Sequence, residues 1–237
     1  MSPMNIRYDF DSGDQHREYA IQVDRKSLEC IKPDDSSVAD WAALNFHQCP
    51  NCPLDVKAVP HCPVAENLAP LISLIGDLNS YDNVRVSVTF DDREMTIEST
   101  MQRAVSSLLG LIMATSPCPF TTLFRPMARF HQPLSNDLET IFRASATYLI
   151  AQYFRVKDGF EFDAELEGLK KIYQNIQVVN KALASRLRAA CEQDAAVNAV
   201  ILLDLLAKEI PYSIDDALDD IRFMFEPYLE QPNTPSK

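Results

Sequence analysis

Four of the six cysteines in this chain are followed directly by proline, and they are its residues best suited to chemistry. The four are Cys49, Cys52, Cys62 and Cys118. With 15 prolines in 237 residues, only about 0.4 such pairs would be expected by chance. The other two cysteines, Cys30 and Cys191, lack the proline. The four Cys-Pro cysteines are therefore treated as one functional set.

Their spacing predicts a thiolate metal site. The step from Cys49 to Cys52 lets two thiolates reach one ion, because the backbone turns tightly between them. Cys62 lies near in sequence and joins with little loop-closure cost. Cys118, separated from Cys62 by 55 residues, would close the site from elsewhere in the fold. Each following proline fixes a φ angle and stiffens the ligand loop before a metal arrives.

The identity of the metal stays open at this level. Thiolates are soft ligands that suit Zn²⁺, the first expectation, or an iron–sulfur cluster, the alternative. Cys-Pro steps are typical of ferredoxin cluster loops, but the spacing C-x2-C-x9-C-x55-C matches no cluster signature. Haem held by a single Cys-Pro thiolate is a minor third alternative.

Polar and charged neighbours could extend this site. The histidines that could replace a cysteine as ligand, or donate hydrogen bonds around the site, are His47, His61 and His131. Arg125 and Arg129, four residues apart in the densest basic segment, would project from one face of a helix. They could bind the carboxylate or phosphate of a cofactor or substrate, balance the charge of a thiolate centre, or form ordinary salt bridges.

No catalytic residues can be assigned, so whether the protein is an enzyme stays open. The Cys49–Cys52 pair could act as a redox dithiol, but Gln48 precedes it and Pro53 follows, unlike a thioredoxin-type helix start. The chain contains no GxSxG elbow, HExxH motif, GxGxxG loop or Walker A loop.

Composition limits the partners and the compartment. The net charge of −12 disfavours binding to nucleic acid or to an anionic membrane surface. The N-terminal residues lack a cationic-then-apolar signal segment, and no apolar run is long enough to span a bilayer. We therefore expect a cytoplasmic protein, where clustered cysteines favour metal or redox chemistry over disulfides.

The residue patterns predict an α+β fold. Alternating apolar residues predict two β-hairpins, Asn5–Phe10 with Glu18–Val23 and Asn83–Phe90 with Arg93–Ser99. Helical periodicity predicts helices over 64–78 and 101–115, with Pro63 in the first turn of the earlier one. These hairpins and helices surround the cysteine-rich loop, and Trp41–Phe46 is a short strand or a helical turn.

The second half of the chain is predicted to be mostly helical. A capping box at Asn136 and Glu139 opens a helix that ends near 157–159. Further helices are expected over 163–192 and 195–210, with Pro211 ending the latter and Ser213 capping a last helix. The segment near 158 divides an α+β domain, residues 1–158, from a helical subdomain, residues 161–237.

Several segments resemble those of an uncharacterised bacterial protein family without a known activity. They span roughly residues 40–160 and comprise Phe46–Pro53, His61–Ala65, Leu109–Pro119 and Arg125–His131. The resemblance implies a family membership and no mechanism.

Three functions are compatible with these sequence features. The first is a metal-thiolate protein with a structural or regulatory role. The second is a redox enzyme or electron carrier that uses an iron–sulfur centre or dithiol at the same cysteines. The third is an interaction module whose helical C-terminal half binds a protein partner.

Overall fold

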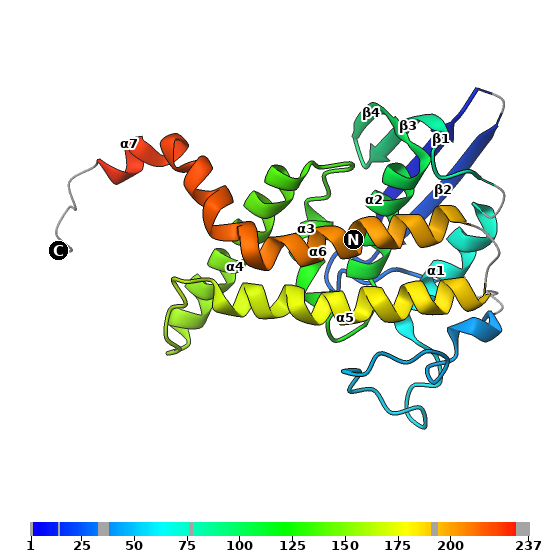
Figure 1. Ribbon diagram of the computed structural model, residues 1–237, viewed down its shortest axis with the longest axis horizontal. Helices are drawn as coiled ribbons and strands as arrows, with labels where there is room; N and C mark the ends of the chain where they lie inside the picture. Colours follow the sequence, from blue (N-terminus) through cyan, green and yellow to red (C-terminus); the bar gives the residue numbers. More distant parts are fainter. Residues whose placement is uncertain (1, 14, 33–37, 76–77, 191–193, 231–237) are drawn as a thin grey trace.

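A computed structural model describes residues 2–13, 15–32, 38–75, 78–190 and 194–230. The architecture is α+β, with a four-stranded antiparallel sheet in the N-terminal part and a mostly helical C-terminal half (Figure 1). This confirms the predicted fold class. Cys191, which the sequence places outside the Cys-Pro set, lies outside the described residues.

The sheet is built from the two predicted hairpins. Its strands are β1 Met4–Asp11, β2 His16–Val23, β3 Asn83–Phe90 and β4 Arg93–Thr100, in the order β2-β1-β3-β4. Asp91 has a φ of 51° in the turn between β3 and β4, a conformation that Asp tolerates better than most residues. Antiparallel pairing of β1 with β3 joins the hairpins, which are far apart in sequence.

Alternation along the strands buries one face of the sheet. The side chains of Ile6, Tyr8 and Phe10 in β1 are almost fully buried, as are Val84 and Val86 in β3. They form one apolar cluster with helix α1, Pro63–Leu74, and helix α2, Met101–Ala114. Pro63 occupies the first turn of α1, as predicted.

The middle of the chain supplies short helices around this cluster. They are the 3-10 turns η1 Asp40–Ala42 and η2 Thr121–Phe124, followed by α3 Arg125–Arg129 and the longer α4 Asp137–Lys157. The predicted capping box at the start of α4 is present, because Asn136 and Glu139 exchange side-chain and backbone hydrogen bonds.

Two long helices dominate the second half. Helix α5, Glu167–Ala190, and helix α6, Asp194–Asp220, lie side by side, and η3 Arg222–Phe225 and α7 Glu226–Leu229 follow (Figure 1). Both long helices contribute to the cluster around the sheet and to a second apolar cluster with α4. The domain boundary near residue 158 stays a prediction.

The expected break at Pro211 is absent. Helix α6 continues through Pro211 to Asp220, so the prediction of a helix end there and a new helix capped by Ser213 was wrong. Proline removes a backbone donor and leaves the carbonyl four residues earlier, at Ala207, without its helical partner. In this structure the side-chain amide of Gln177 on α5 donates to the Ala207 carbonyl oxygen at 2.9 Å. Packing against α5 therefore satisfies the group that proline exposes.

Candidate functional site

The four Cys-Pro cysteines line one small cavity, which we call the cysteine cavity. Cys49 and Cys52 come from the loop before α1, Cys62 from the N-cap of α1, and Cys118 from the segment after α2. Cys118 is buried and the other three are half-buried. The structure thus brings together the set that the sequence selected, from three separate segments.

The loop of residues 43–61 is closed at its base by backbone pairing. Ala43 and His61 form an isolated antiparallel bridge. Beside it, the Leu44 amide donates to the Pro60 carbonyl, and the Cys62 amide donates to the Ala42 carbonyl, each at 2.8 Å. This pairing returns the chain to the start of α1, so that Cys62 comes back to the loop carrying the other two cysteines.

The tip of the loop is a tight turn attached to α5. The Cys52 amide donates to the Cys49 carbonyl at 2.9 Å, which places the two cysteine side chains on one side of the turn. Asn51, between them, donates from its side-chain amide to the Asn175 side-chain oxygen on α5 at 3.2 Å. The loop therefore has a fixed position along α5.

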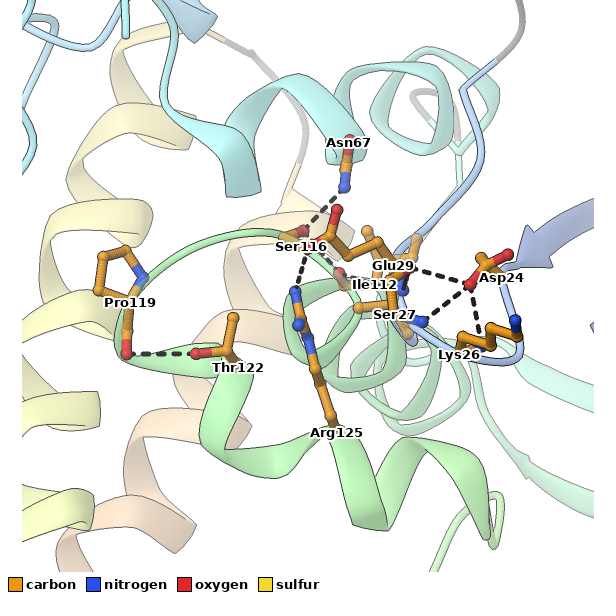
Figure 2. Close-up of polar contacts among 11 residues, drawn as sticks. Asp24, Lys26, Ser27, Glu29, Asn67, Ile112, Ser116, Pro119, Thr122 and Arg125 are labelled. Atoms are coloured by element: carbon orange, nitrogen blue, oxygen red, sulfur yellow. Dashed lines mark hydrogen bonds and ion pairs between the residues drawn. The ribbon is translucent and has the colours of Figure 1, made fainter. Parts of the chain in front are cut away.

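The segment that carries Cys118 is held by hydrogen bonds from α1 and α2 (Figure 2). The Ser116 hydroxyl donates to the Ile112 carbonyl at 2.7 Å and accepts from the Asn67 side-chain amide of α1 at 3.0 Å. Farther along, the Thr122 hydroxyl donates to the Pro119 carbonyl at 3.3 Å. Because Asn67 belongs to the helix that begins after Cys62, these bonds fix Cys118 relative to Cys62.

A buried arginine completes the wall of the cysteine cavity. Arg186 of α5 is only 2% exposed, and its guanidinium donates to the backbone carbonyls of Trp41, Ala43 and Leu44. Among the ion pairs of the described residues, none gives Arg186 a carboxylate partner. Burying a cation without a counter-charge is energetically costly. A negative charge in the cysteine cavity would therefore stabilise Arg186.

Burial disfavours the thiolate form of Cys49 and Cys62 in the absence of a metal. Burial raises the pKa of Cys49 to about 12, and the neighbouring Cys62, Cys118 and Cys52 add to the rise, while Arg186 opposes it. Burial also raises the pKa of Cys62. Any metal that binds here must therefore displace protons from the sulfur atoms.

The cysteine cavity has the size for one small ion. In the part of the chain that the structure describes, no three histidine, cysteine, aspartate or glutamate side chains are arranged to hold a metal ion as they stand. The free volume of the cavity is about 30 Å³, enough for an occupant the size of a water molecule or two, since one water needs roughly 10–15 Å³ on this measure. The four cysteines are among the residues that line this space, and their sulfur atoms would have to move closer together to bind an ion.

The three histidines considered as alternative ligands lie at different places in the fold. His47 lines the cysteine cavity, with its ring edge-on to Phe46 at 4.8 Å between centroids. His61 pairs with Ala43 at the base of the loop and does not line the cavity. His131 lies in a different region, where its Nε2 is hydrogen-bonded to the Tyr8 hydroxyl at 2.5 Å. Of the three, His47 alone stands at the cysteine site.

The two arginines proposed for cofactor binding also lie away from the cysteines. Arg125 forms an ion pair with Glu29 at 2.6 Å, the ordinary salt bridge considered for it (Figure 2). Arg129 stacks on Phe130, 5.4 Å from the ring centroid, and contacts the Met4 sulfur. Neither lines the cysteine cavity, whereas Arg186 does.

Comparison with known families places the chain. Residues 4–226 match the model of a family described as a domain of unknown function, DUF6901. The chain belongs to this family. The match covers nearly the whole chain and agrees with the uncharacterised family that the sequence segments indicated. Comparisons with curated proteins and with solved structures gave no match. None of the described helices of this DUF6901 chain is long and apolar enough to cross a membrane.

Sequence reasoning missed Arg186 in the DUF6901 chain. It stands among the apolar residues of α5, three residues after the buried Leu183. That position was the available signal, because a charged residue within the apolar stripe of a helix is buried and needs a partner. The partners themselves are backbone carbonyls about 140 residues away, which no local pattern reveals.

Proposed function

We propose that the protein binds a metal ion, in the first place Zn²⁺, through the thiolates of Cys49, Cys52, Cys62 and Cys118. One observation carries the proposal: the four Cys-Pro cysteines, drawn from three segments of the chain, line the same small cavity. Four sulfur ligands are the donor set of a closed structural zinc site.

Charge supports the same assignment. Four thiolates around a divalent cation leave an excess of two negative charges, and Arg186 lines the cavity without a carboxylate partner among the described ion pairs. The metal-thiolate centre would supply the counter-charge that a buried guanidinium needs. In the metal-free protein Cys49 and Cys62 do not readily supply this charge, because burial raises the pKa of both thiols.

The cavity favours a single ion over a cluster. Its free volume of about 30 Å³ is small, and an iron–sulfur cluster of several iron and sulfide atoms would need more room than a single ion. A single zinc ion would draw the loop, the start of α1 and the segment after α2 together. The role we propose is therefore structural, or regulatory where metal supply varies.

A redox dithiol at the same position is less favoured. Reactive cysteines have a lowered pKa, whereas burial raises that of Cys49 to about 12. The five cysteines of the described residues are free thiols, the state that metal binding requires. We place the protein in the cytoplasm as part of this proposal, because thiolate ligands need a reducing compartment.

Metal analysis of anaerobically purified protein tests the proposal. One zinc per chain, with a colourless protein, is the expected result. A brown protein with stoichiometric iron and labile sulfide would instead support the runner-up, an electron carrier or redox enzyme with an iron–sulfur centre. Absence of both metals, together with failure of added Zn²⁺ to bind at micromolar concentration, would refute the metal proposal.

Exposed apolar side chains favour the interaction module as a second candidate. Near the C-terminal end of the described chain, Tyr212, Phe223, Tyr228 and Leu229 are each more than half exposed. Such a group of apolar residues is typical of a surface that binds a protein partner. Replacing Phe223 and Tyr228 by serine should abolish a defined complex of the full chain, observed by sedimentation, and leave its metal content unchanged. A complex that survives both substitutions would exclude this surface.

A further inference from the structure

A second and much larger cavity, which we call the central cavity, lies between α2, α5, α6 and the segment of η2 and α3. Its volume is about 550 Å³, within the range of small-molecule binding sites. Its wall is largely apolar and includes Leu111, Phe124, Met127, Ile176, Leu203 and Leu206. Figure 1 shows how α5 and α6 run side by side, with α2 behind them. Protein interiors are normally close-packed, so a space of this size between helices suggests a binding site for a small molecule.

One end of the central cavity carries buried polar atoms without partners. Asn180 of α5 and Thr121 of η2 both line the cavity, and each is 1% exposed. Within the described part of the chain, neither side-chain amide atom of Asn180 has a hydrogen-bond partner, and neither does the hydroxyl of Thr121. Unpaired buried groups of this kind destabilise the folded protein. Together they offer two donor groups and two acceptors to a molecule in the cavity.

Among the further polar residues of the wall is a cation with backbone partners. Arg143 of α4 lines the cavity and donates to the backbone carbonyls of Met127 and Phe130 and to the Ser135 hydroxyl. No ion pair of the described residues gives it a carboxylate. Burial lowers its pKa, partly offset by Tyr173 and by Glu139. A guanidinium in this setting is a binding group for one carboxylate.

The two polar groups stand at opposite ends of the cavity. Arg143 is close enough to Tyr173 for each to influence the pKa of the other. Tyr173 precedes Asn180 by seven residues on α5, which corresponds to about 10 Å along a helix. On the facing segment, Phe124 packs edge-on against Tyr173 at 5.4 Å between centroids, and Thr121 lies one 3-10 turn before Phe124. Phe120, which precedes Thr121, lines the cysteine cavity together with Val179, the neighbour of Asn180, so Thr121 lies toward Asn180.

We infer that the central cavity binds an amphipathic carboxylic acid with a hydrogen-bonding group at its far end. The carboxylate would pair with Arg143, the apolar body would fill the middle, and a hydroxyl or carbonyl group about 10 Å away would meet Asn180 and Thr121. Asp137 and Glu209 also line the wall, so it suits one anionic group rather than a polyanion. This inference does not depend on metal binding, because none of the described cysteines lines the central cavity.

Three probes of matched length test it with the full-length protein. They are 10-hydroxydecanoate, which carries both polar ends, decanoate, which lacks the distal hydroxyl, and 1,10-decanediol, which lacks the carboxylate. In isothermal titration calorimetry we expect 10-hydroxydecanoate to bind about 10-fold more tightly than decanoate, because decanoate lacks the hydroxyl that forms the distal hydrogen bonds. The affinity of 10-hydroxydecanoate should exceed that of the diol by about 10- to 100-fold, because the diol lacks the carboxylate that forms the charge-assisted pair.

Two substitutions test which end of the cavity binds the hydroxyl of the probe and which binds its carboxylate. Asn180→Leu should remove the advantage of 10-hydroxydecanoate over decanoate, and Arg143→Gln should remove its advantage over the diol. Asn180→Leu should also raise the melting temperature of the probe-free protein, because it deletes two unpaired polar atoms. The matched control is Asn198→Leu on α6, which breaks a 2.8 Å bond to Ser80 and should lower the melting temperature without changing probe selectivity.

The outcomes separate the inference from a cavity that holds water only. Equal binding of the three probes, or no binding below millimolar concentration, would overturn it. If Asn180→Leu fails to fold, the same comparison uses Thr121→Val, which removes one unpaired hydroxyl at nearly constant shape. Retention of the full preference for 10-hydroxydecanoate over decanoate in Thr121→Val would then count against the assigned end.

Discussion

The cysteine cavity and the central cavity lie along the same helix and differ in almost every other respect. Val179 and Arg186 of α5 line the small cysteine cavity, whereas Tyr173 and Asn180 line the large central one. The successive residues Val179 and Asn180 thus belong to different sites. One amphipathic helix can therefore serve the core and two distinct chemical environments at once.

The two cavities also differ in how their polar groups are satisfied. In the cysteine cavity, the guanidinium of Arg186 has three carbonyl acceptors but no carboxylate among the described residues. Burial raises the pKa of the Cys49 and Cys62 thiols, so these two provide a counter-charge only after they lose protons. In the central cavity, the side-chain amide of Asn180 lacks a hydrogen-bond partner from any described residue. The first arrangement suits a cation with thiolate ligands, and the second suits an uncharged polar end of an organic molecule.

The largest expected effect is on metal content. Cys118→Ser should reduce bound metal to near zero and lower the free energy of unfolding by roughly 5 kcal/mol, because a metal bound only to the folded chain contributes its binding energy to stability. Metal analysis and urea unfolding measure both. Cys30→Ser, at a half-buried cysteine outside the cavity, is the matched control and should keep the metal. Equal losses of metal in the two variants would show that the metal is not bound specifically in the cysteine cavity.

A second substitution tests the charge of the cysteine cavity. Arg186→Met should lower zinc affinity by about 10- to 100-fold and destabilise the metal-loaded protein by about 3–5 kcal/mol, because it removes the buried cation beside the thiolates. The cost should be smaller in the Cys118→Ser background, where the metal is missing. A competition titration with a chromogenic chelator measures the affinity. An unchanged affinity would show that Arg186 acts only on its three carbonyls.

The central cavity should respond to pH instead. His131 lines this cavity, and burial lowers its pKa to about 3, with a smaller contribution from Arg143. As pH falls below about 6.5 the unfolded chain takes up a proton that the folded chain refuses, so stability is lost toward pH 3 by at most about 1.4 kcal/mol per pH unit. Urea unfolding at pH 7 and pH 4.5 should show a loss in the wild type that His131→Gln reduces by about 2–3 kcal/mol. The exposed His16 provides the control, since His16→Gln should keep the wild-type loss.

The smallest expected effect concerns the connection between α1 and the Cys118 segment. Ser116→Ala should cost about 1–2 kcal/mol, because the buried side-chain amide of Asn67 loses its acceptor. It should also weaken zinc binding slightly while probe selectivity in the central cavity stays the same. Thr122→Ala, which removes an exposed bond to Pro119, should change neither quantity measurably. A metal affinity insensitive to Ser116→Ala would mean that Cys118 is positioned by other contacts.

Most of the elements could be predicted, and the failures have physical causes. The strands follow from alternation, and the capping box at Asn136 is a local signal that the structure confirms. Pro211 misled the prediction, because a bond from Gln177 on a different helix supports the carbonyl that proline leaves free. Pairing of β1 with β3 could not be foreseen either, since strands about 80 residues apart have no local signal for their register.

The candidate sites divide in the same way. The cysteine set was visible because cysteine is uncommon and its Cys-Pro repetition is improbable, so composition alone selected four residues that the fold brings to one cavity. Arg186 and Asn180 carry no such mark. Their importance follows only from their surroundings in the folded chain. Among the described residues, the guanidinium of Arg186 has no carboxylate partner and the side-chain amide of Asn180 has no hydrogen-bond partner.

The amino-acid sequence by itself determined the α+β class, the strand faces and the choice of the four cysteines, because these depend on periodicity and on rare residue types. Tertiary structure alone decided that the four come together beside a buried arginine, that His131 and Arg125 lie elsewhere, and that a large cavity opens along α5. The physical reason is that hydrogen-bond satisfaction and charge balance depend on neighbours brought from distant segments, which no window of sequence contains.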